Sequence, residues 1–378
     1  MMKLFFVDPM SYNNLSIYDW NLIENIDADV YFFGSSKYDY KTLNAKAKFI
    51  YNYNKRSSTL LKTLFYVLNS LLLFNYILMH KPNIVHFQWF KLPVYDVFFI
   101  KLINIFSRKT KIIYTAHNYL PHDTGNKYLK YYKYIYNLVD RIFVHTETTK
   151  KQIEELINNH LKVKVVEHGI IQMDYDHKIA QKIKKGISNK YQLDSKLICL
   201  YIGQVHKYKG VDILINAWNH SSKLKENSNI SLIIAGKGDK ELVKSNANNV
   251  IIDNRFLTNE EFVAYIELAD LILLPYRSIS QSGVLLTILN FKKPILVSNV
   301  GGLPDPLKKA RIGWILQDLE EDTLMKKILE IVSDKKTLEN IKNDQNAWST
   351  IQNLYSWEKI GMNTTKLYTE LLSENNVN

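Results

Sequence analysis

Residues 196–210, which read KLICLYIGQVHKYKG, decide the fold. Their continuous apolar run, 196–202, is typical of a strand that is buried on both faces, as in a parallel sheet. Gly203 follows this strand, and Lys209 lies directly before a segment that predicts a helix over 210–217. Backbone N–H groups, a helix start and a lysine together favour an anion such as a phosphate. An ordinary strand-to-helix loop is the alternative, because the loop is neither a Walker A motif nor G-x-G-x-x-G.

The same alternation of short apolar runs and amphipathic segments continues along the whole chain. It predicts an α/β fold with two doubly wound, Rossmann-like domains. We expect strands at 3–7, 30–33, 48–51, 84–87, 111–115, 141–145, 163–167, 196–202, 230–235, 250–253, 271–275 and 294–298. We expect helices between them, for example at 57–79, 148–158, 210–217, 259–269 and 283–291, and a C-terminal helix at 356–372.

The domain boundaries follow from composition. The first domain is predicted over 1–180 and the second over 190–355, joined near 170–195, where the sequence is polar and rich in lysine. A C-terminal helix is predicted within 356–378. Ligands of such sheets bind at the carboxyl ends of the strands, so the cleft between the two domains is the expected site.

Composition narrows the class of protein. The chain has 378 residues and a formal net charge of +12, from 49 Lys+Arg against 37 Asp+Glu. Its 46% hydrophobic content excludes a wholly disordered chain. The one cysteine, Cys199, excludes a disulfide framework and favours a reducing compartment. Because the first apolar run is too short for a signal peptide, we expect a cytoplasmic protein.

Two segments raise the question of membrane contact. Residues 127–136, KYLKYYKYIY, interleave Lys and Tyr on an expected helix, which could contact anionic headgroups or could be a solvated face with its tyrosines packed inward. Residues 60–79 are strongly apolar but contain Lys62, Asn69 and Asn75, so we interpret them as a core helix of a soluble domain. No basic run or motif indicates nucleic-acid binding.

Three further loops follow predicted strands in the second half of the chain. They read IIAGKGD (233–239), LLPYRSISQSGV (273–284) and SNVGGLPD (298–305). The amides near Ser282–Val284 are expected to point at a polar or anionic group. With the loop at 203–210, these segments resemble, in order and spacing, the nucleotide-sugar half of the family-4-like GT-B glycosyltransferases. The resemblance is strong over 195–372 and weaker over 80–175, through KPNIVH (81–86), TAHN (115–118) and EHGI (167–170).

The resemblance implies a function. The protein would move a sugar from a nucleotide-diphosphate donor (UDP, GDP or dTDP) to a hydroxyl of a glycan. It implies retention of anomeric configuration, no metal and no separate cofactor. The expected acceptor is a lipid-linked oligosaccharide in surface polysaccharide synthesis, reached at the inner face of the cell membrane.

Roles carry over residue by residue. His117 and Lys209 are the implied catalytic residues, with His117 beside the donor sugar and Lys209 on the diphosphate. Arg255 and Phe256 match a loop near the nucleobase. The remaining donor-binding positions implied are Gly203, Gln204, His206, Gly236, Ser280, Gln281, Ser282, Gly283 and Val284.

The sequence also departs from the family pattern. A glutamate pair common in the family falls at Ser280 and Ile288, which carry no carboxyl group, so ribose recognition must differ or weaken. This departure keeps open a second hypothesis, a non-catalytic sugar-nucleotide or glycan-binding partner of another transferase. An NAD enzyme is disfavoured because its fingerprint is absent. The D-x-D at 27–29 is interpreted as hydrated loop acids rather than a metal site, and His86 lines the acceptor side or is a core histidine.

Overall fold

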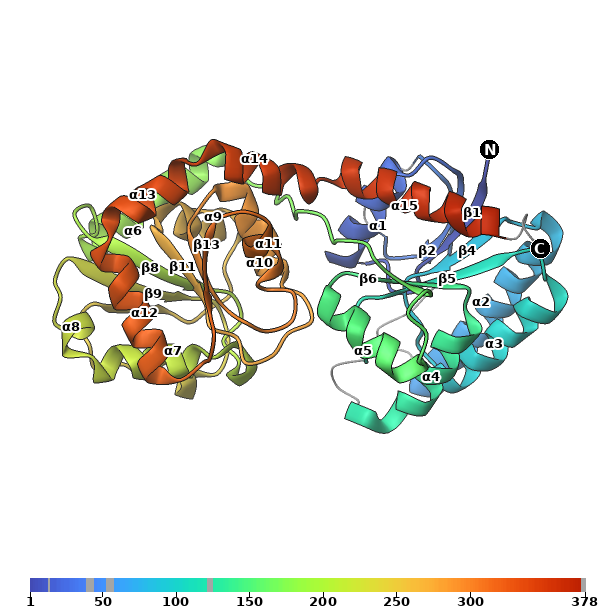
Figure 1. The fold of residues 1–378 in the computed structure, drawn as a ribbon, viewed down its shortest axis with the longest axis horizontal. Helices are drawn as coiled ribbons and strands as arrows, with labels where there is room; N and C mark the ends of the chain where they lie inside the picture. Colours follow the sequence, from blue (N-terminus) through green and yellow to red (C-terminus); the bar gives the residue numbers. More distant parts are fainter. Residues whose placement is uncertain (13, 39–43, 52–57, 121–124, 375–378) are drawn as a thin grey trace. The chain divides into compact units, whose positions relative to one another are not determined.

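The computed structural model describes residues 1–12, 14–38, 44–51, 58–120 and 125–374. The chain forms two compact units (Figure 1). Unit 1 comprises Met1–Gly169 with Tyr355–Asn378, and unit 2 comprises Ile170–Leu354. Each unit is a parallel sheet with helices on both faces, which confirms the predicted fold class.

The sheet of unit 1 has the strand order β3-β2-β1-β4-β5-β6-β7, and all its neighbouring strands are parallel. Its strands are β1 (Lys3–Val7), β2 (Asp29–Ser35), β3 (Lys46–Tyr51), β4 (Ile84–Phe87), β5 (Lys111–Ala116), β6 (Arg141–Val144) and β7 (Val163–Val165). Its helices are α1 (Asn14–Asn25), α2 (Thr59–His80), α3 (Pro93–Phe106), α4 (Leu129–Leu138), α5 (Glu147–Ile157) and α15 (Trp357–Ser373), with a 3-10 turn η1 (Gly125–Tyr128).

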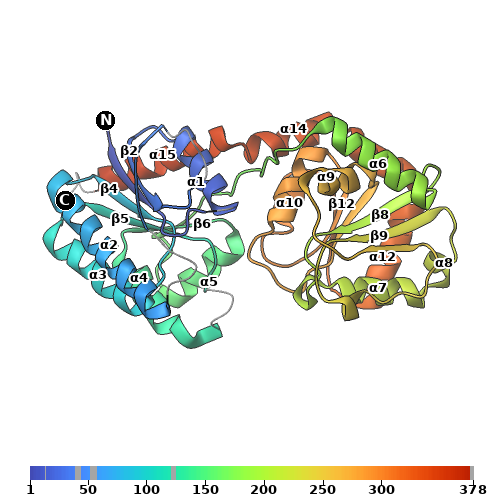
Figure 2. The same cartoon turned by 180° about the vertical axis from the view of Figure 1, so that it is seen from behind.

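Alternating side chains of these strands build two cores, one on each face of the sheet. Phe5 and Val7 of β1 belong to the core under α2 to α5. Leu4 and Phe6 belong to the core under α1 and α15. Figures 1 and 2 show these two helical layers on opposite faces of the sheet. Strands that bury both faces explain why the apolar runs are continuous.

The sheet of unit 2 has the order β10-β9-β8-β11-β12-β13 and is also parallel. Its strands are β8 (Leu197–Ile202), β9 (Ile230–Ala235), β10 (Val250–Asp253), β11 (Leu271–Leu274), β12 (Ile295–Ser298) and β13 (Gly313–Leu316). Its α-helices are α6 (His177–Tyr191), α7 (Val211–His220), α8 (Ser222–Lys225), α9 (Asn259–Leu268), α10 (Gly283–Ile288), α11 (Asp305–Lys309), α12 (Glu321–Ser333), α13 (Lys335–Asn343) and α14 (Gln345–Leu354). Its 3-10 turns are η2 (Lys207–Lys209), η3 (Lys240–Val243) and η4 (Leu289–Phe291).

All the predicted strands and helices occur, and their ends differ by a few residues from the prediction. Ser57, the first residue of the helix predicted over 57–79, lies outside the described residues. Two elements differ from expectation. The edge strand β13 was not predicted, because Gly313 and a run of four residues give little strand signal. The Lys-rich stretch expected to join the domains contains the helix α6, in which Ala180 and Ser188 are buried.

The last helix of the chain, α15, returns to unit 1, as the resemblance implied. It packs along α1 and contributes Ile360 and Tyr368 to the core on that face. The Tyr368 hydroxyl lies 2.6 Å from Nδ1 of His86, and Arg141 donates to both carboxylate oxygens of Glu374 at 2.6 and 2.7 Å.

Candidate functional site

The loops after β8 and β9 in unit 2 pack backbone against backbone. Gly203 has φ +124° and donates its N–H to Ala235 O at 3.0 Å. Gly236 has φ +135°, and a Cβ built there would lie 2.1 Å from Gly203 O. Both positions therefore need glycine, for conformation and for space. The next residues continue the contact, since Val205 N donates to Lys237 O and Asp239 N donates to Val205 O, each at 3.0 Å.

Lys209 ends the turn η2, and three contacts fix this turn. Gly210 has φ +66°, and a Cβ there would lie 1.8 Å from Pro275 O, so the turn rests directly on the loop after β11. Arg277 N donates to Tyr208 O at 2.7 Å. The Arg277 guanidinium forms a bidentate pair with Asp212 of α7, at 2.6 and 2.7 Å. A bidentate pair of this kind sets position as well as energy.

The ammonium group of Lys209 is a buried cation. The residue is 7% exposed, and Nζ lies 5.2 Å from the centroid of the Tyr276 ring. Among the described residues it forms no ion pair with a carboxylate, and burial alone lowers its pKa to about 8. A Cβ on Gly203 would lie 3.4 Å from Nζ and 3.2 Å from Val284 Cγ2. The structure thus brings together Lys209, Gly203 and Val284, three predicted site residues.

The start of α10 holds the other predicted donor contacts. Ser282 is buried and caps the helix, because its Oγ accepts from Leu285 N at 3.3 Å. Gln281 is half-buried, and Gly283 is exposed at the first helical position. The backbone carbonyl of Ser280 accepts a hydrogen bond from Gly302 N at 2.9 Å. The glycine pair at 301–302 therefore supports this loop.

The remaining predicted residues of unit 2 are exposed at the same end of the sheet. Gln204 and His206 are exposed, and the His206 ring stacks on Tyr208 with centroids 5.8 Å apart. Arg255 pairs with Asp253 and Glu261, at 2.9 and 2.8 Å, so its charge is already matched. Phe256 is 80% exposed, which leaves an aromatic face free to stack on a ring.

Ile288, one of the two positions of the missing glutamate pair, is fully buried on α10. It serves the core of unit 2 and faces no solvent. The side chain at 288 can therefore hold no ribose hydroxyl in this chain.

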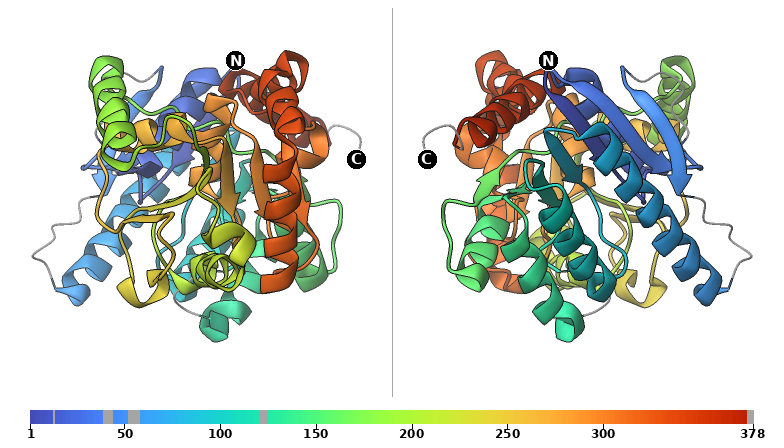
Figure 3. Two further views of the ribbon diagram at one scale, coloured as in Figure 1. Left: turned by 90° about the vertical axis from the view of Figure 1, so that its left-hand side faces the viewer. Right: turned by 90° about the vertical axis from the view of Figure 1, so that its right-hand side faces the viewer.

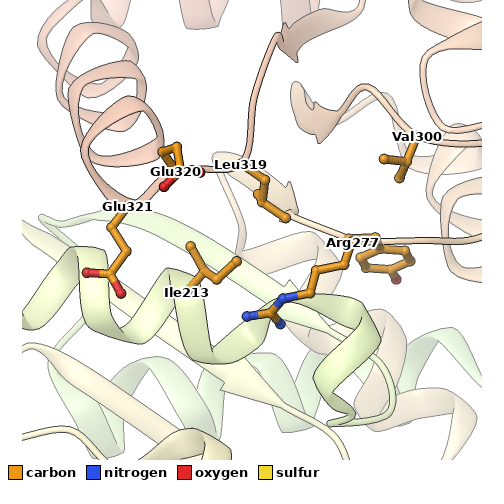
Figure 4. Close-up of a pocket in the computed structure, with 7 residues that line it drawn as sticks. Ile213, Arg277, Val300, Leu319, Glu320 and Glu321 are labelled. Carbon is orange, nitrogen blue, oxygen red and sulfur yellow. The ribbon is translucent and has the colours of Figure 1, made fainter.

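A pocket of about 410 Å³ lies beside the Lys209 turn in unit 2 (Figure 4). It is lined by Ile213, Tyr276, Arg277, Val300, Leu319, Glu320 and Glu321. Two of its charged side chains already have partners: Arg277 pairs with Asp212, and Glu321 accepts from Asn216 at 2.9 Å. None of the predicted site residues lines this pocket, and we assign it no ligand.

In unit 1, polar and aromatic side chains gather where strands β4 to β7 end. His117 follows β5, and its ring stacks on Trp89 after β4, with centroids 4.8 Å apart and an interplanar angle of 7°. His145 follows β6, and His168 follows β7. Tyr18 of α1 contacts all three histidine rings, with centroids 5.0 to 5.5 Å apart. Among the described residues no group of three His, Cys, Asp or Glu is placed to hold a metal ion.

Hydrogen bonds fix which nitrogen of His117 carries a proton. His145 Nδ1 lies 2.8 Å from the carbonyl of Val166 and must donate to it, so His145 Nε2 accepts from His117 Nδ1 at 3.0 Å. Burial lowers the pKa of His117 well below its usual value, so the ring is neutral. Its Nε2 is then an acceptor, and the Gln88 amide 3.1 Å away must turn its nitrogen toward it.

Sequence reasoning did not assign a role to an acidic pair at the same edge of unit 1. Asp8, directly after β1, and Asp19 of α1 are both buried and lie close enough for each carboxyl group to affect the pKa of the other. Burial raises the pKa of Asp8 to about 7, and burial and the neighbouring charge raise the pKa of Asp19. Lys91 lies close enough to Asp8 to lower the pKa of that carboxyl. The position of Asp8 at a strand end was the available signal.

His86 is a satisfied core histidine. It is fully buried, Nδ1 lies 2.6 Å from Tyr368 Oη and Nε2 lies 2.7 Å from Thr115 Oγ1. Two further acids of unit 1 are paired with lysines, Asp140 with Lys111 at 3.2 Å and Asp29 with Lys46 at 2.8 Å.

Two family models match the chain. "Glycosyl transferases group 1" matches residues 183–348, and "Glycosyltransferase Family 4" matches residues 26–171. The first covers the Lys209 turn and the α10 start, and the second covers the histidine edge. The chain belongs to the family-4-like GT-B glycosyltransferases.

Curated relatives agree with this membership. An uncharacterised glycosyltransferase of Methanocaldococcus jannaschii is 26% identical, and the match covers 60% of this chain and 59% of that protein. An uncharacterised 41.2 kDa protein in the cps region of Klebsiella pneumoniae is also 26% identical, over 78% of this glycosyltransferase and 80% of the relative.

Solved structures show the fold. Sucrose-phosphate synthase from Thermosynechococcus elongatus superposes with a TM-score of 0.69 at 15% identity, covering 99% of this chain and 100% of that one. Anabaena HepE in complex with UDP superposes with a TM-score of 0.68 at 12% identity, covering 98% and 100%.

Proposed function

We propose that this glycosyltransferase moves a hexosyl group from a nucleotide-diphosphate sugar to a hydroxyl of a glycan. One observation carries the proposal: Lys209 is a buried cation without a carboxylate partner among the described residues. It lies beside the loops of Gly203 and Gly236, which have no side chain to cover the backbone. Burying an unpaired ammonium is costly, and a diphosphate would offset that cost. The Anabaena relative of similar fold holds UDP, which supports a donor of this class.

The chemistry we propose retains the anomeric configuration and uses no metal or separate cofactor. The bond from the anomeric carbon to the diphosphate oxygen breaks, and the acceptor oxygen bonds to the same face of that carbon. The acceptor proton moves to the departing diphosphate. Lys209 stabilises the negative charge that develops on the leaving group, which is the largest contribution a preorganised site makes. In this proposal a sugar hydroxyl takes the place of the Gln88 amide and donates a hydrogen bond to the neutral Nε2 of His117.

The proposed acceptor is a lipid-linked oligosaccharide in surface polysaccharide synthesis, met at the cytoplasmic face of the membrane. The relative in the cps region of Klebsiella pneumoniae supports a role beside other surface-polysaccharide enzymes. The exposed lysines of η1 and α4 support contact with an anionic surface.

The test is a thermal-shift screen with UDP, GDP and dTDP and their sugars, followed by an assay of donor hydrolysis without acceptor. Ligands that bind the native state raise its melting temperature. We expect one nucleotide to raise it in the wild type and not in Lys209→Met. The control is Lys207→Met, an exposed lysine two residues away that should respond like the wild type. An equal shift in wild type and Lys209→Met contradicts the phosphate assignment.

The buried Ile288 favours a second candidate, a non-catalytic sugar-nucleotide or glycan-binding partner of another transferase. Such a protein would show the thermal shift without releasing nucleotide from any donor, alone or with acceptor. Release of nucleotide that depends on Lys209 rejects this candidate.

A further inference from the structure

The exposed apolar side chains of this protein are concentrated on two helices. Of the 21 large hydrophobic residues exposed in the described part of the chain, 12 lie on α2 and α3. We call them the α2–α3 face: Leu60, Leu61, Leu64, Phe65, Leu68, Leu71, Leu72 and Met79 on α2, and Val94, Phe98, Ile105 and Phe106 on α3. A patch of this kind marks an interaction surface in a soluble fold.

The two helices form one continuous apolar surface. They lie side by side in unit 1, as Figures 1 and 3 show (blue and teal in the right-hand view of Figure 3). Phe74 of α2 contacts the rings of Phe99 and Phe106 of α3, with centroids 6.5 and 6.0 Å apart. On α3, Val94, Phe98 and Ile105 follow the helical period, so they share one side of the helix.

The opposite side of α2 is anchored in the unit. Tyr66, Ser70, Leu73 and Ile77 are buried, and the Tyr66 hydroxyl donates to Asp96 of α3 at 2.8 Å. The expected core helix is therefore a core helix on one side only. By length and composition α2 could cross a membrane, with a mean hydropathy of 1.4 in its most apolar window. Its packed inner side fits a helix that lies on a membrane better than one that crosses it.

The charges around the face have one sign. From Thr59 to Val139 the described residues include a single acid, Asp96, and it is buried. The exposed basic residues described in this region are Lys81, Lys101, Arg108, Lys109, Lys127, Lys130 and Lys133. Helix α4, which carries Lys130 and Lys133, packs against α3. Apolar side chains flanked by basic ones match an anionic lipid surface. By contrast, the positive charge alone does not explain why an acid-rich partner helix would leave water to cover this apolar face.

We propose that the α2–α3 face seats this protein on an anionic phospholipid surface, with the two helices parallel to the membrane and the lysines of α4 against the headgroups. The sequence left open whether the tyrosines of 127–136 contact a membrane or pack inward. The structure buries Tyr132 and Tyr136, so in this proposal those residues supply charge and the α2–α3 face supplies the apolar area. The proposal extends the membrane contact of the proposed function, but it uses neither Lys209 nor His117, so it can fail or hold independently of the sugar transfer.

The test is flotation of the full-length protein with two kinds of vesicle, phosphatidylcholine alone and phosphatidylcholine with phosphatidylglycerol. We expect the wild type to float with the anionic vesicles. Leu68→Glu with Phe98→Glu should lower the bound fraction about tenfold, because each change places a charge in the apolar contact. The double variant Lys101→Glu with Lys130→Glu should lower binding to the anionic vesicles and leave any binding to phosphatidylcholine vesicles unchanged.

Matched controls lie on α15 of the same unit. Met362 is 60% exposed and Lys359 is exposed, so Met362→Glu and Lys359→Glu change an equivalent side chain elsewhere and should float like the wild type. Circular dichroism and melting temperature establish that each variant is folded. Absence of wild-type flotation, or equal flotation by the face variants, overturns the proposal. So does a dimer that Leu68→Glu with Phe98→Glu converts to a monomer, since a second copy would then cover the face.

Discussion

Burial of the charged Lys209 lowers the stability of the folded protein, and a bound anionic ligand should restore it. Its pKa in the folded chain, about 8, is below its ordinary value of 10.5, so the penalty is fully present below pH 8 and fades as the pH rises to about 10.5. We predict that Lys209→Met raises the free energy of unfolding at pH 7 by about 1–3 kcal/mol. Urea unfolding at pH 7 and pH 10 measures it. Lys207→Met, on the exposed neighbour, should change neither value, and a destabilised Lys209→Met would contradict the argument.

The same lowered pKa sets the pH dependence of ligand binding. Above about pH 8 the free protein loses the Lys209 proton, so nucleotide-diphosphate affinity should fall about tenfold per pH unit. Arginine stays protonated throughout this range, so Lys209→Arg should remove most of the fall. Titration calorimetry with the nucleotide found in the thermal-shift screen, between pH 7 and pH 9.5, measures both proteins. A wild-type affinity that is constant over this range counts against Lys209 as the diphosphate ligand.

His117 should affect turnover more than donor affinity. It lies in unit 1, stacked on Trp89 and bonded to His145, whereas the predicted diphosphate ligands lie in unit 2. We predict that His117→Ala lowers kcat about 10- to 1000-fold, with nucleotide Kd changed less than about threefold. His80→Ala, a part-buried histidine on α2, is the matched control. Equal losses of kcat in the two variants would make the role of His117 structural.

At the scale of elements, the glycine loop after β9 holds the proposed diphosphate site in shape. Gly236→Ala places a Cβ 2.1 Å from Gly203 O at a φ of +135°. We expect it to destabilise unit 2 by about 2–4 kcal/mol and to abolish the thermal shift with nucleotide. Gly186→Ala is the control, because nothing lies within 4 Å of its Cβ inside α6. It should raise stability by about 0.5–1 kcal/mol and leave the thermal shift unchanged.

Local patterns predicted the elements, because strands buried on both faces and helices with one apolar side leave a period in the sequence. The glycines at 203, 210 and 236 could also be recognised from the sequence, because each directly follows a predicted strand or begins a predicted helix. Long-range contacts left no such mark. The Arg277–Asp212 pair joins residues 65 apart, and the contact of His145 with His117 joins residues 28 apart. The exposed side of α2 was also hidden, because a buried and a lipid-facing apolar helix have the same composition.

At the scale of the whole molecule, two opposing sets of buried groups determine how stability depends on pH. Burial lowers the pKa of His86 and His168 to about 3 and of His145 to about 4, and that of His117 falls well below its usual value. Their ordinary value is 6.5, so the unfolded chain takes up these protons first. The histidines therefore remove stability as the pH falls below about 6.5.

The buried carboxyl groups of unit 1 have the opposite sign. Burial raises the pKa of Asp8 to about 7 and of Asp96 to about 8, and that of Asp19 well above its ordinary 3.8. The folded chain holds these protons longer than the unfolded chain, so stability is present at low pH and is lost as the pH rises toward 7 to 8. The carboxyls remove stability over the whole rise from about pH 4 to between 7 and 8, whereas the histidines remove it as the pH falls below about 6.5. Because four histidines oppose three carboxyls below pH 6.5 and the carboxyls act alone above it, unit 1 should be most stable near pH 6 to 7.

Asp19→Asn separates the two sets. An amide at 19 carries no charge at any pH, so the penalty for ionising Asp19 disappears and so does its repulsion with Asp8, while the burial penalty of Asp8 remains. We predict that this variant is more stable than the wild type at about pH 8 by about 1–3 kcal/mol, and closer to it at about pH 5.5. Urea unfolding across this range measures the difference. Asp27→Asn, on an exposed loop position, should keep the wild-type profile. A wild-type profile in Asp19→Asn would mean that the pKa of Asp19 is not raised in the folded chain.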